Sequence, residues 1–342
     1  MKILIVCFEM ETFTGSPLYN YTLAIEFLKQ GHKVSIFTTH WADNELKANL
    51  LKAGCNITEV FDEEYDITLI SQPLHNSWFS RIKSKKILNV IHSEYHWETP
   101  MNSDRINAYI AIRENVKQHI VKEHKIPQDM VFVVYNGVDL ARFSAKNRIV
   151  RKDGYIKVVL PCTLDPLREK FLNYYAKRAS QHFRVFIYGK NHMNKGFINP
   201  WVSVNDVVPN IEEKIKDADI VAGILLGRVN LEARAMGVVS VIHNPDNPEE
   251  KEYFFPEWEE FDERHNIKNV AKQIIDIATS AEYRKRERAK MTDSTLEKVV
   301  YSSVMNRFSP VKSGAAIKSE TIIKKRDVSE SDLFKVLRTE VK

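Results

Sequence analysis

Short, wholly apolar runs alternate with stretches of helical periodicity along this sequence, and the alternation leaves few folds open to it. The chain begins with KILIVCF (2–8), continues with a helical pattern at 17–30 and returns to an apolar run, KVSIFTT (33–39). Pro17 suits the first turn of that helix, and Gly31 suits the position just after its end. An unbroken apolar run is typical of a strand buried on both faces, so these residues predict a right-handed, parallel βαβ unit.

The same pattern runs on to residue 139, stops, and starts again. Further strands are expected at 66–71, 86–93, 107–112 and 130–139, with helices at 44–53 and 115–123. After the basic stretch SAKNRIVRKDG, strands are expected at 155–163, 183–189, 201–208, 219–226 and 238–244, with helices at 167–180, 211–217 and from about 230. The sequence therefore predicts an α/β fold of two doubly wound, Rossmann-like domains.

Breaks in the pattern predict the domain boundaries. We expect an N-terminal Rossmann-like domain over 1–146, a linker over 147–155, a C-terminal Rossmann-like domain over 156–290, a helix over 291–308 and a weakly ordered tail over 309–342. The pattern SESDLFKVLRTEV predicts one short helix in this tail. That helix is either a partner-binding element or a tolerated extension.

Composition narrows the class of protein. A hydrophobic content of 44% and a charged content of 28% are typical of a globular protein, and no run reaches the ~18 apolar residues of a membrane span. The opening run is too short for a signal peptide, so we expect a cytoplasmic protein. Cys7, Cys55 and Cys162 are too far apart to predict a zinc site or a disulfide framework.

The net charge of +5 permits an anionic partner without requiring one. Such a partner is a nucleotide-sugar, a nucleic acid or a membrane surface at which the protein associates peripherally. No pattern in the sequence indicates a stable protein partner.

The segment LLGRVNLEARAMGVVSVIHNP (225–245) predicts a strand, a turn and a helix. Gly227 in the turn lets the backbone approach a ligand, and the unpaired N–H groups at the start of the helix suit a phosphate. We expect Glu232 in the first turn, where its carboxylate either accepts hydrogen bonds from a ribose diol or only favours the helix dipole. Gly237 is expected to end the helix.

Several motifs occur in an order that resembles the retaining glycosyltransferases of the GT-B fold, the group that assembles bacterial polysaccharides and glycolipids. They are Thr14–Gly15–Ser16 after the first strand, His92 in VIHSEYHW, YNGVDLARF (135–143), CTLDPLR (162–168) and a Glu-x7-Glu position at 224–232. The resemblance covers about residues 1–305. It implies that the domain over 1–146 is on the acceptor side of a central cleft and that the domain over 156–290 binds the nucleotide-sugar. It also implies metal-independent transfer of a hexose or pentose from a UDP- or GDP-sugar, with no cofactor, to a glycan or lipid-linked acceptor.

The resemblance also implies roles for single residues. His92 would face the transferred sugar, Arg168 would pair with the diphosphate, and both are the expected catalytic residues. Gly15 and Ser16 would let the backbone approach the donor phosphates, and Glu232 would hold the ribose. The remaining donor-binding residues that it implies are Gly189, Gly227, Arg228, Asn230 and Leu231.

The chain departs from the family pattern at two donor-site positions. Thr163 stands where the family has a phosphate-binding Arg, and Ile224 stands where it has the first Glu of the motif. Arg228 is either a replacement cation or a solvated surface residue. These departures keep two other functions open, a non-catalytic scaffold or binding protein of the same fold and an epimerase acting on the nucleotide-sugar. A transferase that modifies nucleic-acid bases is a further alternative.

Two acidic patterns bear on metal binding. Asp217-Ala-Asp219 has the Asp-x-Asp form of metal-dependent transferases, but we expect it at a helix-to-strand junction far from the cleft. His92, Glu94, His96 and Glu98 alternate as metal ligands can, and an acidic acceptor loop explains them as well. We predict no metal site.

Overall fold

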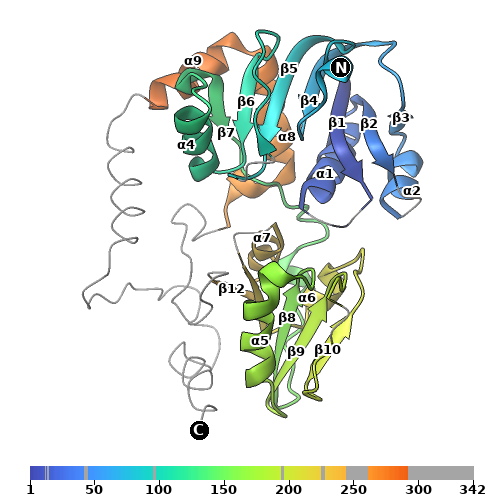
Figure 1. Ribbon diagram of the computed structural model, residues 1–342, viewed down its shortest axis with the longest axis vertical. Coiled ribbons are helices and arrows are strands. Elements are labelled where there is room, and N and C mark those ends of the chain that lie inside the picture. Colours follow the sequence, from blue (N-terminus) through green and yellow to red (C-terminus); the bar gives the residue numbers. More distant parts are fainter. Residues whose placement is uncertain are drawn as a thin grey trace.

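The computed structural model describes residues 1–11, 13, 15–41, 45–94, 98–193, 196–224, 228–243 and 261–291, with side chains as far as 287. Two parallel sheets form two lobes, and Figure 1 shows the first as the upper lobe and the second as the lower. The prediction of two doubly wound α/β units is confirmed.

The first sheet has seven parallel strands in the order β3-β2-β1-β4-β5-β6-β7. The strands are β1 (Lys2–Met10), β2 (Lys33–Trp41), β3 (Asn56–Thr58), β4 (Glu64–Ile70), β5 (Lys83–Ile91), β6 (Ala108–Ala111) and β7 (Val131–Val133). The helices are α1 (Gly15–Lys29), α2 (Glu45–Lys52), α3 (Asn76–Phe79) and α4 (Glu114–Glu123), with a 3₁₀ turn at Gln128–Met130.

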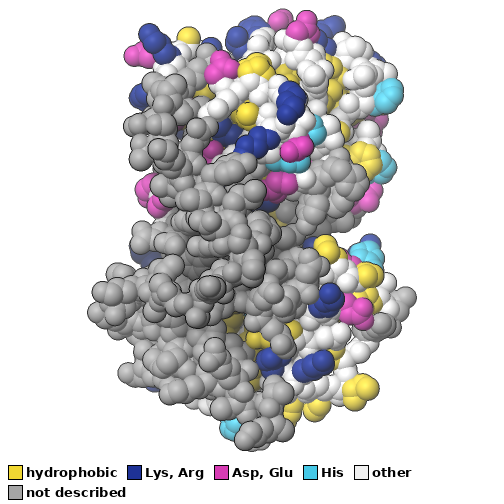
Figure 2. Space-filling view, turned by 60° about the vertical axis from the view of Figure 1, so that its left-hand side comes forward, with side chains coloured by type: hydrophobic (Ala, Val, Ile, Leu, Met, Phe, Trp, Pro, Cys, Tyr) yellow, Lys and Arg dark blue, Asp and Glu magenta, His cyan; other side chains and the backbone are white. Residues whose placement is uncertain are grey.

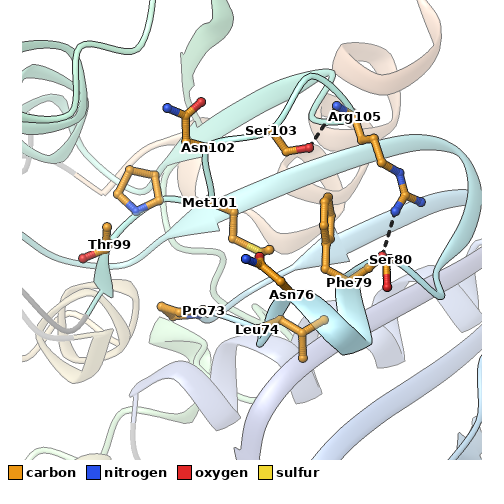
Figure 3. A pocket seen from close by; sticks show the side chains of 11 residues that line it. Pro73, Leu74, Asn76, Phe79, Ser80, Thr99, Met101, Asn102, Ser103 and Arg105 are labelled. Atoms are coloured by element: carbon orange, nitrogen blue, oxygen red, sulfur yellow. Dashed lines mark hydrogen bonds between the residues drawn. The ribbon is translucent and has the colours of Figure 1, made fainter.

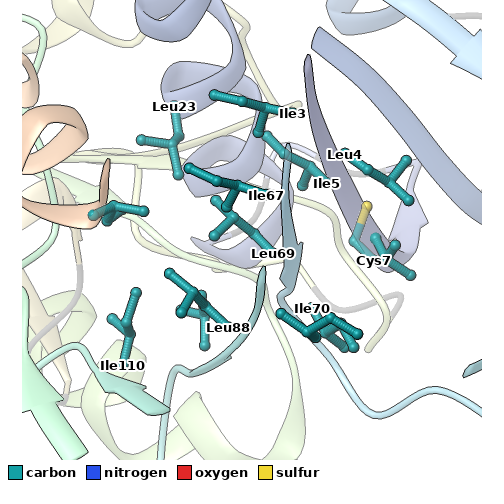
Figure 4. Packing of buried hydrophobic residues seen from close by; sticks show 14 of the residues in the cluster. Ile3, Leu4, Ile5, Cys7, Leu23, Ile67, Leu69, Ile70, Leu88 and Ile110 are labelled. Carbon is teal, nitrogen blue, oxygen red and sulfur yellow. The ribbon is translucent and has the colours of Figure 1, made fainter. Parts of the chain in front are cut away.

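The core of this lobe comes from the apolar runs of the sequence. Ile3, Leu4 and Ile5 of β1 are fully buried between neighbouring strands and α1. Figure 4 shows them packed with Leu23 of α1 and with side chains of β4, β5 and β6. A strand buried on both faces needs apolar residues at successive positions, which explains why β1 reads as a continuous run.

The strand order places the connections on both faces of the first sheet. Starting at β1 in the middle of the sheet, β2 and β3 are added on one side, and β4 to β7 are added on the other side. Right-handed crossovers therefore put α1 and α2 on one face and the connections after β4 on the opposite face. On that opposite face, the connection from β4 to β5 contains a helix of only four residues, α3.

The second sheet has five parallel strands in the order β10-β9-β8-β11-β12. They are β8 (Ile156–Pro161), β9 (Phe183–Tyr188), β10 (Val202–Asn205), β11 (Ile220–Ile224) and β12 (Val239–His243). The helix α5 (Glu169–Arg178) packs on one face, and α6 (Glu212–Ile215) and α7 (Arg228–Ala235) pack on the other. Short 3₁₀ turns lie at Ala145–Asn147 and Pro166–Arg168.

The last described helices return to the first lobe. After a 3₁₀ turn at Glu263–His265, α8 (Ile267–Thr279) buries Val270, Ala271 and Ile274 in the core of the first sheet, and α9 (Ala281–Met291) follows it. Figure 1 shows both helices beside the upper lobe. The predicted second domain, 156–290, groups these helices with the second sheet, but the apolar face of α8 packs on the first.

The chain crosses between the lobes at the Asn136-Gly137-Val138 turn. Val138 N donates to His265 O at 2.8 Å, and Ile267 N donates to Val138 O at 3.1 Å. A Cβ on Gly137 would lie 2.4 Å from Ile267 Cδ1 and 3.0 Å from Ile267 Cα, so glycine suits the close approach of the two backbones. The outgoing and returning segments therefore run side by side here, and Val138 and Phe143 already pack in the core of the second lobe.

Several predicted elements differ from those observed. The strand expected at 130–139 is limited to Val131–Val133, because the next residues leave the sheet for the turn. Gly31 and Gly237 end their helices with φ of 81° and 71°, as predicted. The helix expected over 291–308 and the tail over 309–342 lie outside the described residues, apart from Met291 of α9. Within the described part of the chain, no helix has the length and apolarity needed to cross a membrane.

Candidate functional site

The two sheets face each other with the carboxyl ends of their strands. Arg228 begins α7 just after β11, and its Nη1 donates to Leu18 O of α1 at 2.6 Å. Its Nη2 donates to Thr22 Oγ1 at 2.7 Å. Because α1 follows β1, these bonds bring the ends of two central strands together. Figure 1 shows α1 and α7 at the junction of the lobes.

Glu232 lies one turn further along α7, and its carboxylate is engaged. Arg228 Nε donates to Glu232 Oε1 at 2.6 Å, and the two side chains are only 8% and 5% exposed. The predicted place of Glu232 in the first turn is wrong, because α7 begins at Arg228 and not near Asn230. The idea that Arg228 is a solvated surface residue is also wrong, since its guanidinium is buried and bonded to both lobes.

The other donor-site residues predicted on α7 point into the second lobe. Asn230 is 1% exposed and its Nδ2 donates to Ser240 Oγ at 2.8 Å. Leu231 is buried in the core under the sheet. Because both side chains are buried, Asn230 and Leu231 could contact a ligand only through their backbone atoms. Gly227 lies outside the described residues.

The end of β8 carries two further predicted positions. Arg168 closes the 3₁₀ turn after β8, where Asp165 accepts a hydrogen bond from Arg168 N at 3.0 Å and forms an ion pair with the Arg168 guanidinium. Gly189 follows β9, and a Cβ there would lie 1.9 Å from Cys162 O. Gly189 is thus required by backbone packing beside the site.

Gly15 and Ser16 are the first two residues of α1, so the helix begins two residues before the stretch 17–30 in which the sequence predicts it. A Cβ on Gly15 would meet nothing within 4 Å. The N-terminus of this helix of 15 residues lies at the carboxyl end of β1, so its free N–H groups and positive dipole end are directed toward the second lobe.

His92 follows β5 and is held by its neighbours. Its Nε2 is 2.7 Å from Ser71 Oγ, and its ring lies edge-on to Tyr19 with centroids 4.8 Å apart. Burial lowers the pKa of His92 to about 4, although the hydrogen bond with Ser71 opposes that shift. The imidazole is therefore neutral at pH 7 and can form hydrogen bonds without carrying a charge.

Two acidic residues beside His92 organise the loop that carries it. Glu98 Oε2 accepts from His92 N at 2.9 Å, and burial raises the pKa of the Glu98 carboxyl while hydrogen bonds from Ser93 and His92 lower it. Glu94 pairs with Arg113 at the start of α4. The sequence assigns Glu94 and Glu98 no role of their own in holding His92. It singles them out only through their alternation with His92.

The two acidic patterns weighed for metal binding are placed differently. Asp217 and Asp219 lie just before β11, at the amino edge of the second sheet, where Asp217 pairs with Lys157 at 2.5 Å. This agrees with the expected position far from the facing edges. Across the residues that the structure describes, which exclude His96, no three His, Cys, Asp or Glu side chains are grouped as metal ligands.

Comparison with known proteins shows similarity of structure rather than of sequence. No family model and no curated protein sequence matches the chain. The structure of a glycosyltransferase from Rickettsia africae superposes with a TM-score of 0.54 at 14% identity, covering 89% of this chain and 98% of that one. Anabaena HepE, solved in complex with UDP and glucose, gives 0.55 at 12% identity over 90% of this chain and 100% of its own.

A third structure is that of WaaG, a glycosyltransferase involved in lipopolysaccharide biosynthesis. It gives a TM-score of 0.53 at 10% identity, covering 91% of this chain and 100% of the other. Each match spans both lobes. The chain therefore has the two-lobed α/β architecture of GT-B glycosyltransferases, as the sequence resemblance implies.

Proposed function

We propose that the protein is a glycosyltransferase that moves a sugar from a nucleotide-sugar donor to an acceptor hydroxyl between the lobes. The observation that carries this proposal is the facing of two carboxyl edges, where α1 and α7 both begin and Arg228 joins them. Ligands of doubly wound domains bind at such edges, and helix N-termini favour phosphates. The likeness to HepE, which binds UDP and glucose, supports the same chemistry here.

Transfer of the sugar leaves negative charge on the departing diphosphate, so electrostatic stabilisation of that group is the main task of the protein. We assign it to the N-termini of α1 and α7 and to Arg168. Because Arg168 is paired with Asp165, an incoming diphosphate shares or replaces that partner. Glu232 then offers its second oxygen to the ribose, while the first remains on Arg228.

His92 acts in this scheme as a neutral hydrogen-bonding group facing the transferred sugar. Its lowered pKa makes it a poor base near pH 7, and the departing phosphate takes the acceptor proton. No protein nucleophile is then required, and the reaction retains the anomeric configuration without a metal. The donor is a UDP- or GDP-sugar carrying a hexose or pentose, the acceptor is a glycan or lipid-linked sugar, and the reaction is cytoplasmic.

A non-catalytic protein of the same fold is the second candidate, and Ile224 favours it. This residue ends β11 beside the start of α7, and its apolar side chain is only 8% exposed. In the family that the sequence resembles, the first Glu of the Glu-x7-Glu motif stands at the position of Ile224. A nucleic-acid acceptor has less support, because on the face that Figure 2 shows the described Lys and Arg side chains of the upper lobe are mixed with Asp and Glu.

Nucleotide binding separates these candidates. The purified protein is screened by thermal shift against UDP, GDP, ADP and their sugar conjugates, since a ligand of the native state stabilises it by RT ln(1 + [L]/Kd). We expect a rise in Tm with one nucleotide series. We also expect that Glu232→Gln, which keeps an oxygen for Arg228, weakens the binding several-fold.

The same protein is then given the sugar conjugate of the nucleotide that binds. Release of the nucleotide with the sugar in its original anomeric configuration supports the retaining transferase, whereas binding without turnover supports the second candidate. An absence of any shift would contradict the proposed donor site.

A further inference from the structure

A groove of about 480 Å³ lies on the first lobe, apart from every residue assigned above to the donor. One wall comes from residues 73–80, which include α3, and the other from residues 99–105. Figure 3 shows Asn76 and Leu74 on one side and Met101 and Ser103 on the other.

The groove follows from the short connections of the sheet. The crossover from β4 to β5 contains only the four residues of α3, and the described residues between β5 and β6 contain no α-helix. Over β4 and β5 the sheet is therefore covered by α3 and loops, and the space that a full crossover helix would fill stays open.

Buried hydrogen bonds fix the two walls to each other. Asn89 of β5 is 2% exposed; its Nδ2 donates to Ile70 O at 2.9 Å, and its Oδ1 accepts from Met101 N at 2.8 Å. Tyr109 Oη donates to Met101 O at 2.8 Å.

The end of the groove beside Arg105 is also held by hydrogen bonds between the two walls. Arg105 Nη1 donates to Phe79 O at 2.8 Å, and Nη2 donates to Ile82 O. The shape of the groove is therefore set before any ligand arrives, which lowers the entropic cost of binding.

Both walls of the groove follow, along the chain, residues that hold His92. Ser71, whose hydroxyl bonds to His92 Nε2, lies two residues before Pro73 on one wall. Glu98, whose carboxylate holds His92 N, lies immediately before Thr99 on the other wall. Along the chain, both walls are therefore joined closely to residues that position the proposed reaction centre.

The lining has the chemistry of a carbohydrate site. Its apolar surface comes from Leu74, Phe79 and Met101, and its rim carries amides and hydroxyls such as those of Asn76 and Ser80. None of its 11 residues has a carboxylate. Among the described residues that line the groove, the one cation is Arg105, which is bonded to backbone carbonyls and whose guanidinium lies 4.8 Å from the centre of the Phe79 ring.

This combination selects among possible ligands. The C–H faces of sugars pack on apolar side chains while their hydroxyls bond to amides and hydroxyls. A lipid chain would require a wholly apolar lining, and a nucleic-acid strand would require cations free to meet its phosphates.

We propose that this groove binds a neutral oligosaccharide, the sugars of the acceptor that adjoin the unit receiving the transfer. The acceptor role rests on the proposed function, but the binding of a saccharide does not. Binding is therefore tested without donor or turnover, so that failure of the groove and failure of the nucleotide site are separate results.

The probes are neutral hexasaccharides (maltohexaose, cellohexaose and chitohexaose), with binding measured by saturation-transfer NMR and titration on the full chain. Asn76→Trp places a bulky side chain in the groove, and Ser77→Trp places the same side chain at the adjacent exposed position, which does not line it. We expect at least one hexasaccharide to bind, and Asn76→Trp to weaken it at least about tenfold while Ser77→Trp leaves it unchanged.

Unfolding temperatures confirm that both variants are folded. Asn102→Ala, at an exposed rim position, is a milder variant and is expected to weaken binding a few-fold. The proposal is overturned if none of the three sugars binds, if Asn76→Trp and Asn102→Ala bind as the unmodified chain does, or if a single-stranded DNA dodecamer displaces the bound sugar.

Discussion

Arg228 and Glu232 form a buried ion pair one turn apart on α7, with 2.6 Å between Arg228 Nε and Glu232 Oε1. The same guanidinium reaches across to Leu18 O and Thr22 Oγ1 of α1. The carboxylate that we propose for the ribose is therefore also part of the contact between the lobes. We therefore expect nucleotide binding and the arrangement of the lobes to be coupled through this pair.

The pair makes a direct prediction for stability. Arg228→Ala leaves Glu232 buried without its cation, and breaking a buried pair in this way costs about 3–5 kcal/mol of unfolding free energy. Urea unfolding measures this loss. Arg286→Ala, which removes a cation whose side chain is 65% exposed, is the control and is expected to change stability little. Equal stability of the two variants would mean that the Arg228 contact contributes nothing.

Arg168 provides a test of the diphosphate site. Arg168→Gln is expected to weaken UDP binding about tenfold, because a charge-assisted hydrogen bond to phosphate is lost. Isothermal titration with UDP measures the affinity. Lys170→Gln, an exposed cation two residues away on α5, is the matched control. If both variants bind UDP equally well, the phosphate does not sit beside the turn at Pro166–Arg168.

His92 predicts a pH dependence of stability. Its pKa in the folded protein is lowered to about 4, so below its ordinary value of 6.5 the unfolded chain binds a proton that the folded chain does not. The stabilisation is complete above pH 6.5 and is lost as the pH falls toward 4, by up to about 3 kcal/mol. His92→Gln lacks this contribution. Parallel stability curves for the two proteins between pH 7 and pH 4 would contradict the assigned environment.

Gly189 predicts a packing effect separate from any binding. Gly189→Ala places a Cβ 1.9 Å from Cys162 O, and because backbone occupies that space the strand ends must move apart. We expect a loss of about 2 kcal/mol or more in unfolding free energy. Gly196→Ala, where a Cβ meets nothing within 4 Å, is the comparison and is expected to unfold like the parent chain.

The fold could be predicted wherever burial alone decides the residue types. Strand β9, expected at 183–189, is found at Phe183–Tyr188, and α4, expected at 115–123, is found at Glu114–Glu123. The three residues of β3 and the four of α3 were not predicted, because such short elements leave no periodicity to read. They depend on neighbours that are distant in the sequence.

The candidate site could be predicted only in outline. The choice of His92 and Arg168, which the structure places after β5 and β8, follows from the family resemblance. The partners of these side chains do not. Arg228 meets Thr22 across 206 residues, and Ser71 meets His92 across 21, and no local pattern encodes either contact.

The crossing at Gly137 and Val138 has a consequence for how the molecule is built. The chain leaves the first lobe and re-enters it at residues bonded to each other, since Val138 pairs with Asn266. The second lobe is thus an insert between β7 and α8, and the first lobe is closed by a segment that follows the insert. Excising residues 138–265 would bring two neighbouring ends together across a short turn. The second lobe, to which we assign nucleotide binding, is therefore joined to the first by two adjacent chain crossings, and a lobe of different base specificity could be grafted at these two junctions.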